Sequence, residues 1–254
     1  MRALCEPVLM RVETRGPLAA LDSARLAIKG ALAGKYHAVV AAPHNEAAIR
    51  AAGVDFDGYP SFVARTCGLA PEEGILMLCF RHGGREIRIA HVTLHSSVVD
   101  AVHGISRHAV LRTIRATHEA LTRLYVKNPR IVVSGLNPHA VGAEEEKVIA
   151  PAIEEARKGM RVDGPIGADT LIQREGYDAY VVMLHDQGHV AAKVLAPNRA
   201  AAMTIGTPIL FSSVAHGAAF DIAGKDRADP SAMVEAITRL VTRRRRAPGT
   251  RKTA

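Results

Sequence analysis

Short apolar runs that read as buried strands alternate along this chain with longer segments of helical periodicity. Strand-like runs occupy residues 36–42, 75–80, 86–93, 130–134, 177–184 and 201–206. Helix-like segments occupy residues 18–33, 45–52, 60–68, 106–127, 144–157 and a last stretch after Pro230. This order predicts an α/β fold whose sheet is largely parallel. In such sheets ligands bind beyond the carboxyl ends of strands, so functional side chains are expected there.

Composition excludes several other classes. A chain of 254 residues that is 48% hydrophobic can bury a sizeable core, and without an internal repeat or long linker it reads as one unit over residues 1–254. No window approaches the roughly 18 uncharged apolar residues of a membrane span, and the first residues lack the apolar stretch of a signal peptide. We therefore expect a soluble, cytoplasmic protein. Cys5, Cys67 and Cys79 lack CxxC spacing, which favours buried or incidental thiols over disulfides or a cysteine zinc site.

The positive charge is concentrated at the carboxyl end. Seven of the 33 basic residues lie from Arg239 onwards with no acid among them, so the rest of the chain carries 26 basic against 25 acidic side chains. With only 4% aromatic residues to stack on bases, this pattern argues against nucleic-acid binding by the folded body. We expect residues 243–254 to be a solvated, disordered basic tail, with a polyanion-binding tail as the alternative.

Three histidines follow strand-like segments. His95, His139 and His185 each come after an apolar run, close to glycine, proline or polar residues. Imidazole is a common ligand for divalent metals, and three ligands with an open position can polarise a substrate oxygen. The alternative is that twelve histidines supply three such positions by chance.

Other catalytic patterns are weak or absent. His91 and His95, like His185 and His189, are four residues apart, but no glutamate follows the first histidine as in zinc proteases. One of these segments is a β-branched strand and the other contains Gly188, so neither is expected to be a metal-binding helix. The chain has no GxGxxG after its first strand, no GxxxxGK[ST] and no GxSxG.

Two carboxylates and one lysine near the strand ends are further candidates. Asp169 and Asp186 could each orient a histidine or accept a proton, or simply cap a helix or turn. Lys193 could bind an anionic group of a substrate, although most lysines are solvated surface.

Taken together, several motifs resemble the 4-hydroxythreonine-4-phosphate dehydrogenase family of pyridoxal phosphate biosynthesis. They are GLNPHA at 135–140, GADTL at 167–171, HDQGH followed by Lys193 at 185–193, and HGAAFDIAGK with ADP at 216–230. HVTLH and AAPHNEA are looser matches, and the resemblance runs in one order from about residue 16 to 241.

The resemblance implies a fold and a chemistry. The fold would be the two-domain architecture of isocitrate and isopropylmalate dehydrogenases, with two interleaved subdomains. The family works as a homodimer whose active site lies in the interdomain cleft and takes histidines from both subunits. Its enzymes oxidise a secondary alcohol with NAD or NADP while a divalent metal such as Zn, Mg, Mn or Co holds the substrate, and the β-keto acid can lose carbon dioxide. The metal ligands would be His95, His139 and His185, and Lys193 would bind substrate.

The sequence also departs from the family pattern. The GHTE motif that holds the substrate reads Gly58-Tyr59-Pro60-Ser61, and a substrate-binding asparagine and arginine fall on Ala202 and Phe211. Losing a guanidinium removes a donor fork suited to phosphate. Members also start some tens of residues earlier, so an incomplete sheet edge or cleft wall is expected.

These observations favour a metal-dependent, NAD(P)-linked dehydrogenase acting on a hydroxy acid, either 4-hydroxythreonine-4-phosphate-like or a dihydrodiol carboxylate. The alternative is a truncated, non-catalytic paralogue that binds metal or a ligand without turnover.

Overall fold

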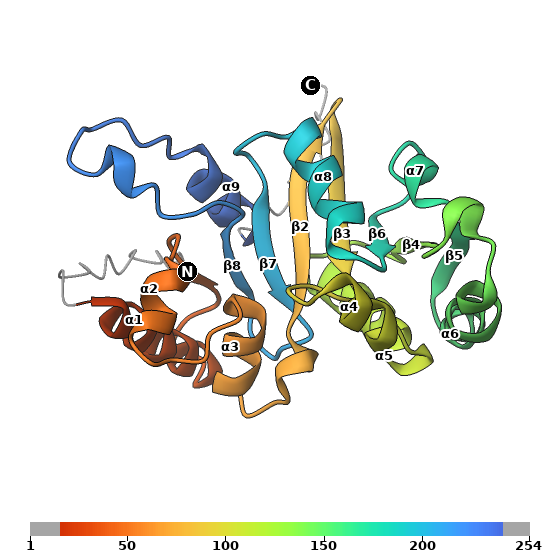
Figure 1. Cartoon of the computed structure of the whole chain (residues 1–254), viewed down its shortest axis with the longest axis horizontal. Coiled ribbons are helices and arrows are strands. Elements are labelled where there is room, and N and C mark those ends of the chain that lie inside the picture. Colours follow the sequence, from red (N-terminus) through yellow and green to blue (C-terminus); the bar gives the residue numbers. More distant parts are fainter. Residues whose placement is uncertain (1–15, 241–254) are drawn as a thin grey trace, which may run out of the picture.

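A computed structural model describes residues 16–240 as one eight-stranded sheet with helices on both faces (Figure 1). The strand order across the sheet is β1-β8-β7-β2-β3-β6-β4-β5. The strands are β1 (Val39–Val40), β2 (Ile75–His82), β3 (Arg85–His91), β4 (Arg130–Ser134), β5 (Arg161–Ile166), β6 (Ala179–Val182), β7 (Ala201–Ile205) and β8 (Phe211–Val214). The α-helices are α1 (Gly16–Leu32), α2 (Glu46–Ala51), α3 (Tyr59–Thr66), α4 (Val98–Gly104), α5 (Arg107–Arg123), α6 (Ala150–Arg157), α7 (Ala168–Leu171), α8 (His185–Leu195) and α9 (Ser231–Leu240). Cys5 and the tail predicted at residues 243–254 lie outside the described residues.

The sheet is parallel towards its two edges and antiparallel at its centre. β3, β6, β4 and β5 run parallel to one another, and so do β1 and β8. β2 is antiparallel to both β3 and β7, and β7 is antiparallel to β8. Four of the seven strand pairings are therefore parallel, which confirms the predicted α/β class with a mostly parallel sheet.

Different helices cover the two faces of the sheet. On one face, α5 contacts β2, β3, β6 and β7 through buried residues such as Val110 and Ile114, and α9 contacts β7 and β8. On the other face, α8 contacts β2, β3 and β6, while α1 and α3 gather around Phe211 (Figure 1). Since α8 and α3 stand apart on that second face, the strands between them are left open to a cavity. Within residues 16–240, no helix is long and apolar enough to cross a membrane.

Local sequence signals explain several element boundaries. The Ser106 hydroxyl accepts a hydrogen bond from the Ala109 amide and starts α5 at the predicted place. Within the helix predicted at 144–157, Pro151 cannot donate a backbone hydrogen bond, and a π-helical turn at Glu145–Ile149 gives way there to a new helix that begins at Ala150.

Other elements differ from the sequence prediction. Residues 185–195 form α8, so the expectation that Gly188 keeps this segment from being a helix is wrong. The strand expected at 36–42 pairs only at Val39–Val40. The helix α4 and the strands β5 and β8 were not predicted, because they lack a clear period of their own and are fixed by packing.

Candidate active site

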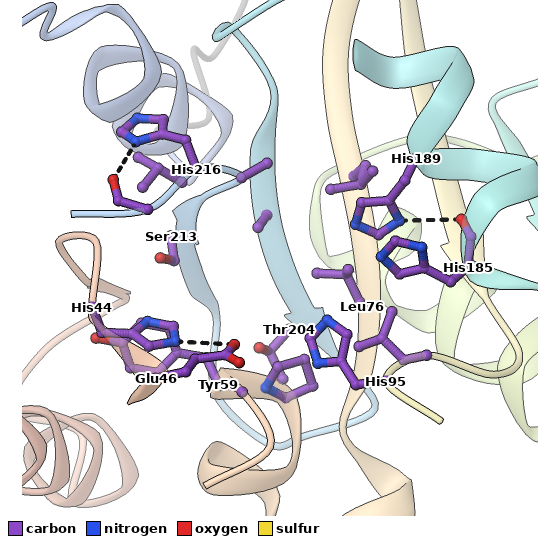
Figure 2. A pocket seen from close by; sticks show the side chains of 18 of the residues that line it. His44, Glu46, Tyr59, Leu76, His95, His185, His189, Thr204, Ser213 and His216 are labelled. Atoms are coloured by element: carbon purple, nitrogen blue, oxygen red, sulfur yellow. Dashed lines mark hydrogen bonds and ion pairs between the residues drawn. The ribbon is translucent and has the colours of Figure 1, made fainter. Parts of the chain in front are cut away.

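The main cavity lies over the open face of the central strands. It has a volume of about 460 Å³, and β2, β7 and β8 form its floor. The floor side chains are Leu76, Leu78, Ala202, Thr204 and Ser213. The walls come from α2 and α3 on one side and from the β3 and β6 ends with α8 on the other (Figure 2). This volume falls within the range of ordinary small-molecule sites.

His95 and His185 enter this cavity with their ring centres 5.8 Å apart. The Nδ1 atom of His95 lies 2.9 Å from the Asp57 carbonyl oxygen, and that of His185 lies 2.6 Å from Asp186 Oδ1. Since both acceptors engage Nδ1, the Nε2 atom of each ring is left with its lone pair free. This is how metal-binding histidines are oriented in proteins.

Asp186 belongs to this arrangement as the partner of His185. Its side chain is exposed, and the hydrogen bond from His185 holds the pKa of the carboxyl below its ordinary value. Of the three roles that the sequence left open for Asp186, its position fits the orientation of a histidine.

Two further histidines pack behind the pair. The ring of His189 stacks on His185 with centres 3.7 Å apart and planes within 10°, because residues four apart share one face of α8. Burial lowers the pKa of His189 to about 4 and that of His91 to about 3. Both rings are therefore neutral near pH 7, so they add no positive charge that would repel a cation.

Lys193 lines the same cavity one turn further along α8. It is exposed, and its ammonium forms no hydrogen bond or ion pair with any side chain in residues 16–240. Glu46 is the only carboxylate among the described residues that line the cavity, and it is paired with the Arg50 guanidinium at 3.1 Å. Lys193 is thus a cation available to an anionic ligand.

His139 and Asp169 lie together, but not in this cavity. His139 is exposed on the turn after β4, in a left-handed conformation with φ of 59°. Gly167, two residues before Asp169, brings the two segments together, since a Cβ on it would lie 3.5 Å from His139 Cα and 2.7 Å from Asp169 Oδ1. Within the described part of the chain no three acidic, histidine or cysteine side chains form a metal-binding group. One chain therefore brings His95 and His185 together and leaves His139 apart.

Some of the positions that depart from the family pattern line the cavity, and one is buried away from it. Ala202 is on the cavity floor, and Tyr59 and Pro60 are in its wall. Phe211 is fully buried beneath Tyr59, with ring centres 5.0 Å apart, and is not part of the lining. The ring that replaces the arginine is thus used for packing and offers no surface to a ligand.

Sequence reasoning missed several side chains that shape the cavity. His44 packs edge-on against Tyr59 in the wall, and Thr204 and Ser213 stand on the floor (Figure 2). Burial raises the pKa of Tyr59 to about 12, so its hydroxyl stays protonated and donates to the Ala42 carbonyl. The motif AAPHNEA carried a signal for His44, whereas nothing in the sequence distinguished Thr204 or Ser213.

The fold and this site define a class. The sequence pattern of the family described as pyridoxal phosphate biosynthetic protein PdxA matches residues 8–240. The chain belongs to this family, which confirms the resemblance seen in its motifs. The fold is also similar to that of isocitrate dehydrogenase from Methylococcus capsulatus, with a TM-score of 0.51 at 17% identity over 79% of this chain and 66% of that one.

Relatives within the family are dehydrogenases. A 1,2-dihydroxy-3,5-cyclohexadiene-1,4-dicarboxylate dehydrogenase of Comamonas sp is 44% identical over 88% of this chain and 71% of its own length. A 4-hydroxythreonine-4-phosphate dehydrogenase of Burkholderia vietnamiensis is 39% identical over 91% of this chain and 72% of its own. The crystal structure of a terephthalate 1,2-cis-dihydrodiol dehydrogenase from Burkholderia xenovorans LB400 superposes with a TM-score of 0.71, at 39% identity over 89% of this chain and 73% of that one. The chain is accordingly classed with the oxidoreductases that act on hydroxyl groups, and the non-catalytic alternative gains no support.

Proposed function

We propose that this chain is a metal-dependent, NAD(P)-linked dehydrogenase that oxidises a hydroxyl group on a carboxylated, non-phosphorylated ring, as in a cis-dihydrodiol carboxylate. The observation that carries the proposal is the cavity floor of Leu76, Leu78 and Ala202, with Phe211 buried where the family has an arginine. A floor with these three apolar side chains and no guanidinium suits an unsaturated ring better than a phosphate. The dihydrodiol dehydrogenases among the relatives support the same choice.

The residues present fit a divalent metal. His95 and His185 offer two oriented Nε2 atoms on one side of the cavity. Imidazole donors suit Zn or Co better than Mg, with Mn between them. When bound, such an ion would polarise the substrate oxygens and stabilise negative charge on them.

A second copy of the chain would complete the ligand set. His139 and Asp169 lie side by side outside the cavity of their own chain, which suits delivery to a neighbouring site. In a homodimer, His139 would join His95 and His185 across the interface. Asp169 would arrive with it and, since Asp186 is engaged with His185, would be the carboxylate free to accept the hydroxyl proton.

Lys193 would hold the carboxylate of the substrate next to the reacting carbon. A charge-assisted contact of this kind fixes the orientation of the hydroxyl towards the histidines. NAD or NADP would take the hydride, and a β-keto acid formed in this way can then lose carbon dioxide.

Turnover by the purified chain tests the proposal. The protein would be supplied with Zn²⁺, Mn²⁺ or Mg²⁺, with NAD⁺ or NADP⁺, and with dihydrodiols of benzoate and terephthalate beside 4-hydroxythreonine 4-phosphate. We expect reduced nucleotide with a dihydrodiol and much less with the phosphate ester. Preference for the phosphate ester, or no reduction with any substrate, would refute it.

Two variants refine this test. Lys193→Ala should lower kcat/KM about 10- to 100-fold, whereas the exposed Lys158→Ala should not change it. His139→Ala should lose bound metal and dimer-dependent activity, and full metal retention in that variant would contradict the shared site.

A further inference from the structure

We propose that the hydroxyls of Ser213 and Thr204 bind a second carboxylate of the substrate, at the end of the ring away from the reacting hydroxyl. They would thereby select dicarboxylates over monocarboxylates. This inference rests on the proposed function and adds a specificity site to it.

Both side chains are buried hydroxyls without a protein partner. Ser213 and Thr204 are each only 3% exposed, yet both line the cavity. Neither hydroxyl forms a hydrogen bond with any group in the described part of the chain, and neither oxygen is sealed from the cavity as the Ser212 oxygen is sealed in the core. Because a buried hydroxyl left unpaired is unfavourable, these two are poised to bond to a ligand.

The strand register places the two hydroxyls on one face. Thr204 pairs with Phe211 and Ala202 pairs with Ser213, so Thr204 and Ser213 are diagonal neighbours across β7 and β8. Diagonal neighbours are roughly 7–8 Å apart, and side chains can converge across that distance on a group between them. Ala202, which pairs with Ser213 and lines the cavity, carries only a methyl group and leaves room for such a group.

Hydroxyl donors in this setting suit a carboxylate. A carboxylate has two oxygens that accept short hydrogen bonds from hydroxyls, and it needs less charge compensation than a phosphate. The acid across the cavity, Glu46, is paired with the Arg50 guanidinium at 3.1 Å, so its repulsion of an incoming anion is reduced.

The position on the floor indicates which carboxylate is bound. Leu76 and Leu78 on β2 lie on the side of the floor nearer α8, Thr204 on β7 pairs with Leu76, and Ser213 lies two strands away from β2 on β8. A ring seated on these leucines would direct a substituent on its far side towards β8. The substrate named for the Comamonas relative carries such a second carboxylate, across the ring from the first.

Binding measurements on the full chain test this without turnover. Calorimetric titration with terephthalate and with benzoate, in the presence of Zn²⁺, compares two probes that differ by the second carboxylate. We expect the unmodified protein to bind terephthalate at least tenfold more tightly than benzoate. Ser213→Ala and Thr204→Val should each weaken terephthalate binding about tenfold and leave benzoate binding within about twofold.

Two further variants serve as controls. Ser212→Ala deletes the same hydroxyl one residue away, on the opposite face of β8, and should change neither affinity. Thr204→Ser keeps the hydroxyl and should retain most of the preference for terephthalate.

The possible failures are distinguishable. Equal affinity for both probes in the unmodified protein, no binding of either, or equal losses for both probes in Ser213→Ala would overturn the specificity site. If these variants behave as expected but no dihydrodiol is oxidised, the proposed function fails and the carboxylate site stands. Oxidation of the benzoate dihydrodiol alone would leave the function intact and refute the specificity site.

Discussion

The His91 imidazole occupies the space that a side chain at Gly188 would need. A Cβ at position 188 would lie 2.3 Å from His91 Nε2 and 2.9 Å from Ile89 Cγ2. His91 cannot move away easily, because it is buried and its Nδ1 is 3.3 Å from the Leu76 carbonyl oxygen. The glycine in HDQGH therefore lets α8 lie close to β3 and brings His185 to the cavity.

Because of this contact, replacing the helical Gly188 with alanine should lower the stability of the protein instead of raising it. Alanine normally stabilises a helix interior by about 1 kcal/mol relative to glycine. We expect Gly188→Ala instead to destabilise the protein by about 1–3 kcal/mol, because the extra methyl overpacks the His91 contact. Urea unfolding measures the change, with Gly159→Ala as the control, since nothing lies within 4 Å of a Cβ there. A Gly188→Ala variant as stable as the unmodified protein would contradict the packing.

Because Phe211 is buried, we expect that replacing it with the arginine of the family pattern will destabilise the protein. The Phe211 ring is fully buried against Tyr59 in the cluster around α1 and α3. Phe211→Arg would place an unpaired charge in that cluster, and we expect it to cost at least about 3 kcal/mol of stability. Ala202→Asn faces the cavity and should cost less than about 1 kcal/mol. Thermal unfolding of both variants checks this, and gain of phosphate-ester turnover by a stable Phe211→Arg variant would show that the ring has another role.

The sequence predicted those helices and strands in which hydrophobic residues recur with a clear helical or strand spacing. Strand β4 followed from its apolar run and helix α5 from its helical periodicity, since such local signals survive in the folded chain. Strand β8 has no such signal, because FSSV presents a phenylalanine and a serine to one face of the sheet and two other residues to the second. Its pairing with β7 and β1 depends on distant segments.

The sequence predicted those site residues whose position follows from the order of elements along the chain, but not those placed by strand pairing. His95 and His185 stand just after strand ends, where chain order alone favours a ligand site, and Lys193 follows on the helix that His185 begins. Thr204 and Ser213 reach the cavity through the antiparallel register of β7 and β8, which the sequence does not reveal. The stacking of His189 on His185 depended on α8 being helical, and Gly188 had argued against it.

The hydrogen bond between His185 and Asp186 is expected to raise the affinity of the site for a metal. The Asp186 carboxylate lies 2.6 Å from Nδ1 of His185, a ring that lines the cavity, and so leaves Nε2 available to a metal. Asp186→Ala should lower Zn²⁺ affinity about 10- to 100-fold in a competition titration with a chromophoric chelator. Asp186→Asn keeps an acceptor oxygen and should lose less. Equal affinity in Asp186→Ala and the unmodified protein, together with a loss in His185→Ala, would show that Asp186 does not orient the ring.

The Glu145 carboxylate holds the turn that carries His139, and we expect its contribution to stability to depend on pH. This carboxylate is 3% exposed and accepts hydrogen bonds from the Leu136 amide at 2.7 Å and from the Asn137 amide and side chain at 2.8 Å. Burial opposes its ionisation, but the bonds from Asn137 and Leu136 outweigh burial and hold the pKa below its ordinary value of 4.5. A carboxyl whose pKa is lowered by folding stabilises the protein fully above that ordinary value, and this stabilisation is lost as the pH falls through the folded-state pKa.

We therefore expect Glu145→Gln to destabilise the protein by about 1–3 kcal/mol at pH 7, because the amide cannot accept all these bonds. The difference from the unmodified protein should begin to shrink below pH 4.5, where the carboxyl of the unfolded chain takes up a proton, and should be lost as the pH falls through the lower folded-state pKa. Urea unfolding between pH 3.5 and 7 measures both effects. Glu146→Gln is the matched control, since that neighbouring side chain is exposed and should change stability by less than about 0.5 kcal/mol. A destabilisation by Glu145→Gln that stays constant over this range would show that the charge of Glu145 does not hold the His139 turn.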